Sequence, residues 1–584
     1  MRRTKIVCTL GPAISSVEMM EQLILSGMNV ARLNFSHGTH EEHLARVKML
    51  REAAGRLGRE IPIMLDNKGP EIRIGLFENG KTVLSEGGRF TLTTRPVMGN
   101  DTMVAVEYVA LPHEVQVGGL ILLDDGTITL RVESVHGEDV VCAVVNGGEL
   151  SNRKKVNLPG AIVSLPAVSQ KDVDDIRFGA DQGFDFVAAS FIRKASDVLE
   201  IRKVIEDAGS DMQIIAKIEN QEGVDNLDEI LKVVDGLMVA RGDLGVEIPA
   251  EEVPIVQKEM IQKCQRLGIP VITATQMLDS MIRNPRPTRA EASDIANAIF
   301  DGTDAIMLSG ETASGKFPIE AVRTMARIAE RAEKALVYQE PTARRMRRAE
   351  HTITDAISHA VCQTALDLGA SAIVSATQSG HTARMMAKYR PQAPVIAVTP
   401  SVRVARKLAL SWGVYPVLGG ETSSTDEMIK NALGATLGAG YIRSGDLVVL
   451  TAGVPVGVPG TTNMLQVHTV GDIAVRGVGI GTGSFTGRAV IAHTAREASQ
   501  KLNGPNQVLV TIGVDAEYVP ALGSAAALIT EEAGLTSPGA IIGLNLGIPV
   551  IVGAEGATSL ITDETEITLD LNRGLVYRGQ ARVL

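Results

Sequence analysis

Eight short apolar runs recur in the first 311 residues, and each has the length and composition of a buried β-strand. They are KIVCTL (5–10), NVARLN (29–34), IPIMLD (61–66), FDFVAAS (184–190), QIIAKIE (213–219), GLMVARGD (236–243), PVITATQ (270–276) and AIMLSGE (305–311). Helix-compatible stretches separate most of them. Eight alternating β and α units predict an α/β fold with a closed parallel (β/α)8 barrel, the TIM barrel.

Several of these runs end in polar residues. In such a barrel the carboxyl ends of all strands open onto one face, where the chemistry takes place. A set suited to phosphate and cation chemistry is therefore expected on that face. Its members are Arg32, Asn34, Asp66, Lys217, Glu219, Asp243, Thr275 and Ser309.

The barrel pattern is interrupted once, between residues 66 and 184. There the runs FTLTT, MVAVEYV, LILLDDGTITLRVESV and VVCAVV are broken by GG, DDG and NGG turns, which predicts a small antiparallel β domain. Because this domain is inserted at the chemical face, it is expected to close over the site as a lid.

Beyond the barrel, strands SAIVSAT, APVIAVT and DLVVLTA alternate with helical stretches and predict an α/β domain with an open sheet. The basic run ARRMRRAE (343–350) before it is either a contact patch or the solvated face of a connecting helix. A Gly-rich last block predicts an extra compact β/α module. The expected domains are a barrel (1–69 and 171–342), a β-barrel lid (70–170), an α/β domain (343–472) and the last module (473–584).

Composition narrows the function classes. Among 584 residues, 45% are hydrophobic and 21% are charged, as in an ordinary globular protein. The net charge of −11 argues against a general nucleic-acid binder, and no apolar run is long enough to span a membrane. The apolar part of the N-terminus is too short for a signal peptide, and the four cysteines are widely spaced without a CxxC pair. A cytoplasmic protein with reduced thiols is expected.

Two acidic residues and a lysine suggest a metal and phosphate site. Glu219 and Asp243 would repel each other at the barrel mouth unless a cation lies between them, and such a pair suits Mg²⁺. Lys217 lies two residues before Glu219, so both point to the same side of a strand. Beside a phosphate, Lys217 would stabilise a transferring phosphoryl group or an enolate. Ordinary salt bridges are the alternative.

Three further segments are candidate binding loops. Arg32 suits bidentate phosphate binding, and the oxygens of Asn34, Ser36 and Asp66 suit a monovalent cation, although ARLNFSHG is equally a polar loop. In TATQML, a threonine hydroxyl is placed to bind a substrate carboxylate. TQSGHT (377–382) precedes a helical stretch and forms either a phosphate nest or a plain βα loop.

The motifs ARLNFSHG, DNKGPEIR, KIEN, MVARGDLG, TATQMLDSM, RPTRAE and MLSGETA, in this order, closely resemble pyruvate kinase over about residues 1–472. The short start before KIVCTLGP resembles bacterial members. The resemblance implies phosphoryl transfer from phosphoenolpyruvate to ADP, giving pyruvate and ATP, the last step of glycolysis. It also implies a homotetramer regulated by a phosphorylated effector.

The resemblance also implies roles for individual residues. Arg32 contacts the phosphoryl group, Lys217 stabilises the transition state, and Gly242 and Thr275 hold the substrate carboxylate, with Thr275 proposed to protonate the enolate through water. The other implied sets are Glu219 and Asp243 for Mg²⁺ (or Mn²⁺); Asn34, Ser36, Asp66 and the Asn67 carbonyl for K⁺; and Arg73, Lys154 (or Lys155) and His37 for the nucleotide. Family members that need no K⁺ carry Lys where this chain has Glu71, so K⁺ dependence is predicted.

The effector loop and the last module depart from their relatives' patterns. The effector-binding residues implied are Thr377, Ser379, Gly380, His381 and Thr382. Gln378 replaces a Lys of fructose-bisphosphate-activated animal enzymes, and TAGVPVGVPGTTN (451–463) lacks the Trp and Arg of the second effector loop, so a monophosphate such as AMP or a pentose phosphate is expected. The module resembles the swivelling phosphohistidine domain of phosphoenolpyruvate synthases, but Pro538 stands where the catalytic His belongs. Proline has no nucleophilic nitrogen, so that chemistry is expected to be absent.

Two other functions remain open at this point. A catalytically inactive, sugar-phosphate-sensing barrel would be expected to lack Lys217, Glu219 or Asp243, and all three are present. A phosphotransferase from phosphoenolpyruvate to water or pyrophosphate would need the missing histidine.

Overall fold

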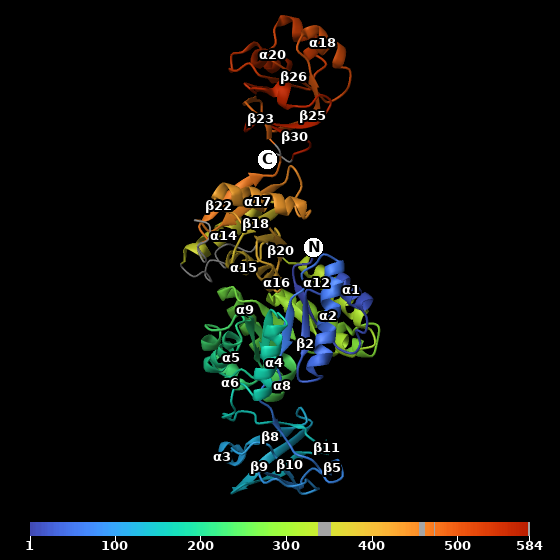
Figure 1. Ribbon diagram of the computed structural model, residues 1–584, viewed down its shortest axis with the longest axis vertical. Coiled ribbons are helices and arrows are strands. Elements are labelled where there is room, and N and C mark those ends of the chain that lie inside the picture. Colours follow the sequence, from blue (N-terminus) through green and yellow to red (C-terminus); the bar gives the residue numbers. More distant parts are fainter. Residues whose placement is uncertain (337–351, 455–461, 472, 582–584) are drawn as a thin grey trace. The chain divides into compact units, whose positions relative to one another are not determined.

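A closed eight-stranded parallel barrel forms the centre of the first unit, and it confirms the predicted fold (Figure 1). The computed structural model describes residues 1–336, 352–454, 462–471 and 473–581, so the basic run 343–350 lies outside the described residues. The strands run β1–β17–β16–β15–β14–β13–β3–β2 around the barrel. Their bounds are β1 (Lys5–Thr9), β2 (Val30–Asn34), β3 (Ile63–Asp66), β13 (Phe186–Ala189), β14 (Gln213–Ile218), β15 (Gly236–Ala240), β16 (Val271–Ala274) and β17 (Ala305–Leu308).

Helices surround this barrel, and their starts follow from capping side chains. Ser16, Thr39, Ser169 and Thr288 each accept a hydrogen bond from a backbone N–H of the first turn, and the last three have an acidic partner that returns the bond. The helices of the barrel are α1 (Val17–Ser26), α2 (His40–Arg56), α4 (Gln170–Asp181), α5 (Ala195–Asp207), α6 (Gln221–Asp225), α7 (Leu227–Ile230), α8 (Arg241–Glu247), α9 (Val253–Leu267), η1 (Asp279–Ile282), α10 (Arg289–Asp301), α11 (Gly310–Ala313) and α12 (Pro318–Glu333).

Side-chain alternation along the strands separates a dry barrel interior from a polar rim. On β14, Ile214, Ala216 and Ile218 pack beneath the helices, whereas Ile215 belongs to the cluster inside the barrel. Two residues further along the inward face comes Lys217. The inward positions are therefore aliphatic or aromatic along most of each strand and become polar only near the carboxyl ends.

The opposite end of the barrel is filled from a distant part of the chain. Leu410 is fully buried in the same interior cluster as Val7, Met238 and Met307. It belongs to Ser401–Pro416, a segment that is part of the barrel's compact unit. Its helix α16 (Val402–Leu408) is anchored to the barrel because Arg403 and Lys407 pair with Asp211 at 2.6 and 2.8 Å.

The insert is a β domain between β3 and α4. Its strands pair in the order β4–β12–β8–β9–β10–β6–β7, with β11 and β5 as a separate ribbon, and the pairs are antiparallel except β6 with β7. Isolated bridges between Ile74 and Val106 and between Phe77 and Gly99 join the edges, so the expected β-barrel is closed by short bridges and not by a continuous strand pair. The elements are β4 (Ile72–Arg73), β5 (Lys81–Leu84), β6 (Arg89–Thr93), β7 (Met103–Ala105), α3 (Leu111–Glu114), β8 (Leu120–Leu123), β9 (Ile128–His136), β10 (Asp139–Asn146), β11 (Gly148–Ser151) and β12 (Lys155–Asn157).

The second unit holds two sheets. The predicted open α/β sheet has the order β20–β19–β18–β21–β22 and is packed by α14, α15 and α17. The last module is a mixed eight-stranded sheet of order β23–β30–β29–β25–β26–β27–β28–β24. The elements of the first are α14 (Ile353–Asp367), β18 (Ala372–Ala376), α15 (His381–Lys388), β19 (Val395–Thr399), β20 (Val414–Leu418), α17 (Thr425–Gly438), β21 (Leu447–Ala452) and β22 (Met464–Thr469). Those of the second are β23 (Ile473–Arg476), β24 (Val478–Ile480), β25 (Ser484–Ile491), α18 (Ala495–Lys501), β26 (Gln507–Thr511), η2 (Ala516–Tyr518), α19 (Val519–Leu522), β27 (Ala527–Thr530), α20 (Pro538–Leu546), β28 (Val550–Val552), α21 (Ala557–Leu560), β29 (Glu566–Asp570) and β30 (Leu575–Arg578).

Within the part of the chain that the structure describes, none of the helices combines the length and the apolar character that crossing a bilayer requires.

Replacing Leu410 with Ala is expected to destabilise the barrel, because it opens a cavity in the interior cluster. The free energy of unfolding should fall by about 2–5 kcal/mol, as measured by urea denaturation. Leu199→Ala is the control, since Leu199 is 52% exposed on α5. Equal losses for the two variants would contradict the role given to Leu410.

Candidate active site

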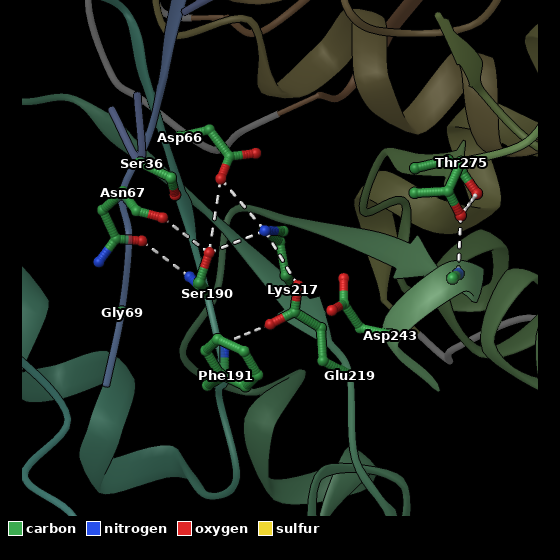
Figure 2. Close-up of polar contacts among 12 residues, drawn as sticks. Ser36, Asp66, Asn67, Gly69, Ser190, Phe191, Lys217, Glu219, Asp243 and Thr275 are labelled. Atoms are coloured by element: carbon green, nitrogen blue, oxygen red, sulfur yellow. Dashed lines mark hydrogen bonds and ion pairs between the residues drawn. The ribbon is translucent and has the colours of Figure 1, made fainter. Parts of the chain in front are cut away.

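Four charged side chains meet at the carboxyl ends of β2, β3 and β14. Arg32 Nε donates to Asp66 Oδ2 at 2.7 Å. Lys217 Nζ lies 3.1 Å from Asp66 Oδ1 and 2.9 Å from Glu219 Oε1. Asp66 and Glu219 are only 1% exposed, so these charges depend on one another for compensation (Figure 2).

The pKa shifts in this cluster follow from burial and charge pairing. Burial alone would lower the pKa of Lys217, but Asp66 and Glu219 outweigh it, so that pKa is raised and the ammonium stays charged. For Asp66, burial acts to raise the pKa, but Arg32 and Lys217 prevail and lower it. The pKa of Glu219 is raised, first by burial and then by the charge of Asp243.

Ser190, which was absent from the predicted set, connects the cluster to the neighbouring strand. It accepts a hydrogen bond from Lys217 Nζ at 2.7 Å and donates to the Asn67 carbonyl at 2.8 Å. The next residue, Phe191, donates its backbone N–H to Glu219 Oε2 at 2.7 Å. Ser190 ends the run 184–190, so the strand-end rule that selected the other residues also applies to it.

The sequence pattern placed Asp243 at the end of a strand, and the structure shows otherwise. Strand β15 ends at Ala240, and Asp243 lies in the first turn of α8. The chain turns here because Arg241 donates to the Ala274 and Thr275 carbonyls and pairs with Asp294 at 2.7 Å. The helical turn carries the Asp243 carboxylate to the same side of the barrel mouth as Glu219 (Figure 2).

The pair Glu219 and Asp243 fits a divalent cation. Among the described residues no three His, Cys, Asp or Glu side chains gather as a metal site. Mg²⁺ usually takes one or two carboxylates and completes its shell with water and substrate oxygens. Burial raises the pKa of Glu219 and the charge of Asp243 raises it further, and a cation between the two carboxylates would relieve this second effect.

Thr275 and Gly242 form a second polar group beside the cluster. Gly242 donates its backbone N–H to Thr275 Oγ1 at 2.8 Å, and Thr275 Oγ donates to the Ala274 carbonyl at 2.7 Å. Thr275 has a φ of 67°, a conformation that costs energy for a β-branched residue. The strain places its hydroxyl next to α8. Ser309, by contrast, donates its backbone N–H to Glu311 and belongs to the loop after β17.

The predicted K⁺ ligands lie on adjacent strands. Asn34 and Asp66 are paired positions of β2 and β3, and Ser36 donates its backbone N–H to Asn34 Oδ1 at 3.1 Å. Ser36, Asp66 and Asn67 lie in one region of the site (Figure 2). A single carboxylate among neutral oxygens fits a monovalent cation in donor type.

On the lid side, the structure brings Lys155 and not Lys154 to the site. Lys155 Nζ donates to Asp243 Oδ1 at 2.8 Å, whereas Lys154 pairs with Asp124 at 2.8 Å. Asp243 and Glu219 raise the pKa of Lys155 against the lowering effect of its burial, which is the largest single influence. Strand β12 begins at Lys155, so Lys154 belongs to the turn before the strand and is not held by it.

The two other predicted nucleotide residues, Arg73 and His37, make local contacts. Arg73 pairs with Glu71 at 2.6 Å and donates to the Arg153 carbonyl at 2.8 Å. His37 is exposed on the loop after β2, where its carbonyl oxygen lies 3.0 Å from His43 Nε2.

The predicted effector loop forms the turn between β18 and α15. Gly380 has a φ of 80° and donates its N–H to Thr377 Oγ1 at 2.9 Å, while the His381 N–H donates to Ser379 Oγ at 3.4 Å. Thr382 lies 2.8 Å from Thr462 in the second loop, of which residues 455–461 are outside the described residues.

Pro538 occupies the first position of α20, directly after the N-cap Ser537. Proline suits this position because its fixed φ matches the helix and its missing N–H would have had no helical partner.

Comparisons with known proteins agree along the chain. The family description "Pyruvate kinase, barrel domain" matches residues 1–322, "Pyruvate kinase, alpha/beta domain" matches 355–468, and "PEP-utilising enzyme, mobile domain" matches 503–574. Pyruvate kinases of Bacillus licheniformis and Geobacillus stearothermophilus are each 57% identical over the full length of both chains. The crystal structure of a pyruvate kinase from Cryptosporidium parvum is similar with a TM-score of 0.77 and 41% identity, covering 80% of this chain and 96% of that one.

Removing Lys217 is expected to make the protein more sensitive to acid. A depressed carboxyl pKa contributes stability that is present above the unfolded-state pKa and lost as the pH falls through the folded-state pKa. In Lys217→Met the pKa of Asp66 rises, so the loss should begin at a higher pH. Acid unfolding followed by circular dichroism measures the midpoint. The exposed Lys203→Met is the control, and an unchanged midpoint in Lys217→Met would refute the coupling.

Proposed function

Because this chain belongs to the pyruvate kinase family of phosphotransferases, we propose that it transfers the phosphoryl group of phosphoenolpyruvate to ADP, giving pyruvate and ATP in the last step of glycolysis. The observation that carries this proposal is the buried cluster of Arg32, Asp66, Lys217 and Glu219 at the barrel mouth. Phosphoryl transfer needs positioning and charge neutralisation more than covalent catalysis. This cluster supplies the positioning and two cations, and the proposed metal ions would supply the rest of the neutralisation.

The proposed roles follow from the position of each group. Arg32 and Lys217, held by Asp66, direct positive charge toward the phosphoryl group. Lys217 also stabilises the enolate that remains when the phosphoryl group leaves. The Gly242 N–H and the Thr275 hydroxyl bind the substrate carboxylate. Thr275 also delivers a proton to the enolate carbon through a water.

Cations complete the proposed site. Glu219 and Asp243 would hold Mg²⁺ (or Mn²⁺), which, when bound, neutralises negative charge on substrate oxygens. Asn34, Ser36, Asp66 and the Asn67 carbonyl would hold K⁺. Pyruvate kinases are in general metal-dependent.

The inserted domain supplies the nucleotide side. Arg73, His37 and Lys154 or its neighbour Lys155 are proposed to bind ADP and ATP. Lys155 is better placed for this than Lys154 because it already reaches Asp243. Closure over the bound substrates would exclude water, which otherwise would accept the phosphoryl group.

Regulation and assembly are further parts of the proposal. The loop of Thr377, Ser379, Gly380, His381 and Thr382 is proposed to bind AMP or a sugar monophosphate, and a thermal-shift comparison of AMP, ribose 5-phosphate and fructose 1,6-bisphosphate tests it. A bisphosphate preference would refute it. The last module, whose Pro538 replaces the phosphohistidine, is proposed to be structural or regulatory, so a chain without it should keep its turnover.

A cytoplasmic homotetramer is proposed as the working state. One face between α10 and α12 supports contact between copies, because half-exposed Phe300 lies in a groove lined by Arg323, Arg327 and Arg331. Aromatic and arginine side chains are enriched at protein interfaces. Sedimentation analysis measures the assembly, and a monomer would refute it.

Lys217→Met is expected to lower turnover by about 10²–10³-fold, because it removes the charge that stabilises the enolate. Binding of phosphoenolpyruvate should remain measurable by calorimetry, since Arg32 and the cation ligands are retained. Release of pyruvate that depends on ADP, with and without Mg²⁺, is the assay. Near-normal turnover would refute the role, and no activity in the unaltered protein would favour a sensing barrel.

Glu71→Lys is expected to remove the K⁺ requirement, because a tethered ammonium would take the place of the ion. Glu71→Gln is the matched control, since it removes the same carboxylate without supplying a cation. Both lose the pairing with Arg73, so any difference between them reports on the ammonium. Initial rates with K⁺ and with tetramethylammonium distinguish the outcomes. Equal K⁺ dependence in both variants would contradict the prediction.

A further inference from the structure

A cavity of about 350 Å³ lies between the inserted domain and the barrel. Its walls come from β12 and the connection that follows it, from α6 and from the loop after β13. Apolar side chains such as Ile72, Leu158 and Val163 line much of it. The volume is within the range of small-molecule sites. The proposed reaction uses one lining residue, Lys155, whose ammonium donates to Asp243 outside the cavity.

Each of the two cations in the wall, Lys155 and Arg193, is paired with a carboxylate that does not line the cavity. Lys155 donates to Asp243 outside the cavity. Arg193 donates Nε to Asp197 at 3.2 Å and its two terminal nitrogens to the carbonyls of Val163 and Leu165 at 2.6 and 2.7 Å. The wall therefore has little positive charge to offer an anion.

The cavity wall, in contrast, has more hydrogen-bond acceptors and acidic groups than cations. Four acidic residues line the cavity against the two basic ones: Glu71, which is paired with Arg73, and Glu222, Asp225 and Glu247. Asn157 is 4% exposed, and its Oδ1 is buried without a partner while its Nδ2 donates to Glu247. A buried acceptor without a partner is costly, and a ligand that donates hydrogen bonds would relieve the cost.

We propose that this cavity binds a small organic cation, an amine with an apolar body. The body packs against the aliphatic wall, and the ammonium lies among the carboxylates of Glu222 and its neighbours. The same charges repel phosphates and carboxylates, so the site differs in chemistry from that of the proposed substrates. A ligand here contacts both β12 and α6 and therefore holds the lid connection against the barrel.

Titration of the full-length protein with three matched probes tests this inference independently of catalysis. Benzylamine, benzyl alcohol and benzoate share one ring and differ in charge. Calorimetry or NMR should show saturable binding of benzylamine with a Kd on the order of millimolar. Benzyl alcohol should bind more weakly, and benzoate should not bind.

Glu222→Lys should weaken benzylamine binding about tenfold or more. Glu229→Lys is the control, because Glu229 is an exposed residue of α7 that does not line the cavity. If Glu222→Lys does not fold, Asn157→Leu, which removes the unpartnered acceptor, gives the same comparison. The inference is refuted if benzoate binds as tightly as benzylamine, if a folded variant binds like the unaltered protein, or if benzylamine does not saturate.

Discussion

Charge compensation around Asp66 is the interaction on which the barrel mouth depends. Asp66 joins Arg32 on one side to Lys217 on the other, and Lys217 in turn joins Glu219. Two cations and two carboxylates leave this set formally neutral. A phosphoryl group that enters it therefore brings charge that the protein alone does not balance, which is a physical reason for the proposed site to need added cations.

The rest of the first unit holds this set in place. An aliphatic interior beneath the rim excludes water, and low polarity strengthens the interactions among the charges above it. Ser190 and the Phe191 N–H fix Lys217 and Glu219 from the neighbouring strand. Strand register thus determines much of the geometry of this charged set.

Much of this arrangement could be predicted from alternation along the strands. The eight runs, the inward direction of Lys217 and the adjacency of Asn34 and Asp66 all follow from period two and from strand order. Tertiary contacts decided what the pattern left open. Hydrogen bonds from Arg241 begin the helical turn that contains Asp243. The position of β12 brings Lys155, and not Lys154, to Asp243.

Three features were not predicted from the strand pattern: Ser190, the closed end of the barrel, and the identity of the ligands. Ser190 obeyed the strand-end rule and was overlooked, because a lone serine after an apolar run carries little signal. The barrel's closed end had no local signal, since Leu410 follows α16 by two residues and resembles any apolar residue after a helix. Metal, nucleotide and effector preferences depended on family resemblance, because residue types alone are compatible with several ligands.

The position of Leu410 has a consequence for synthesis on the ribosome. The last barrel strand ends at Leu308, but the residue that fills the opposite end emerges about a hundred residues later. At translation rates of about 5–20 residues per second, the nascent barrel waits several seconds with part of its interior uncovered. Chaperone binding during that interval, and not after release, would then govern the yield of folded chain.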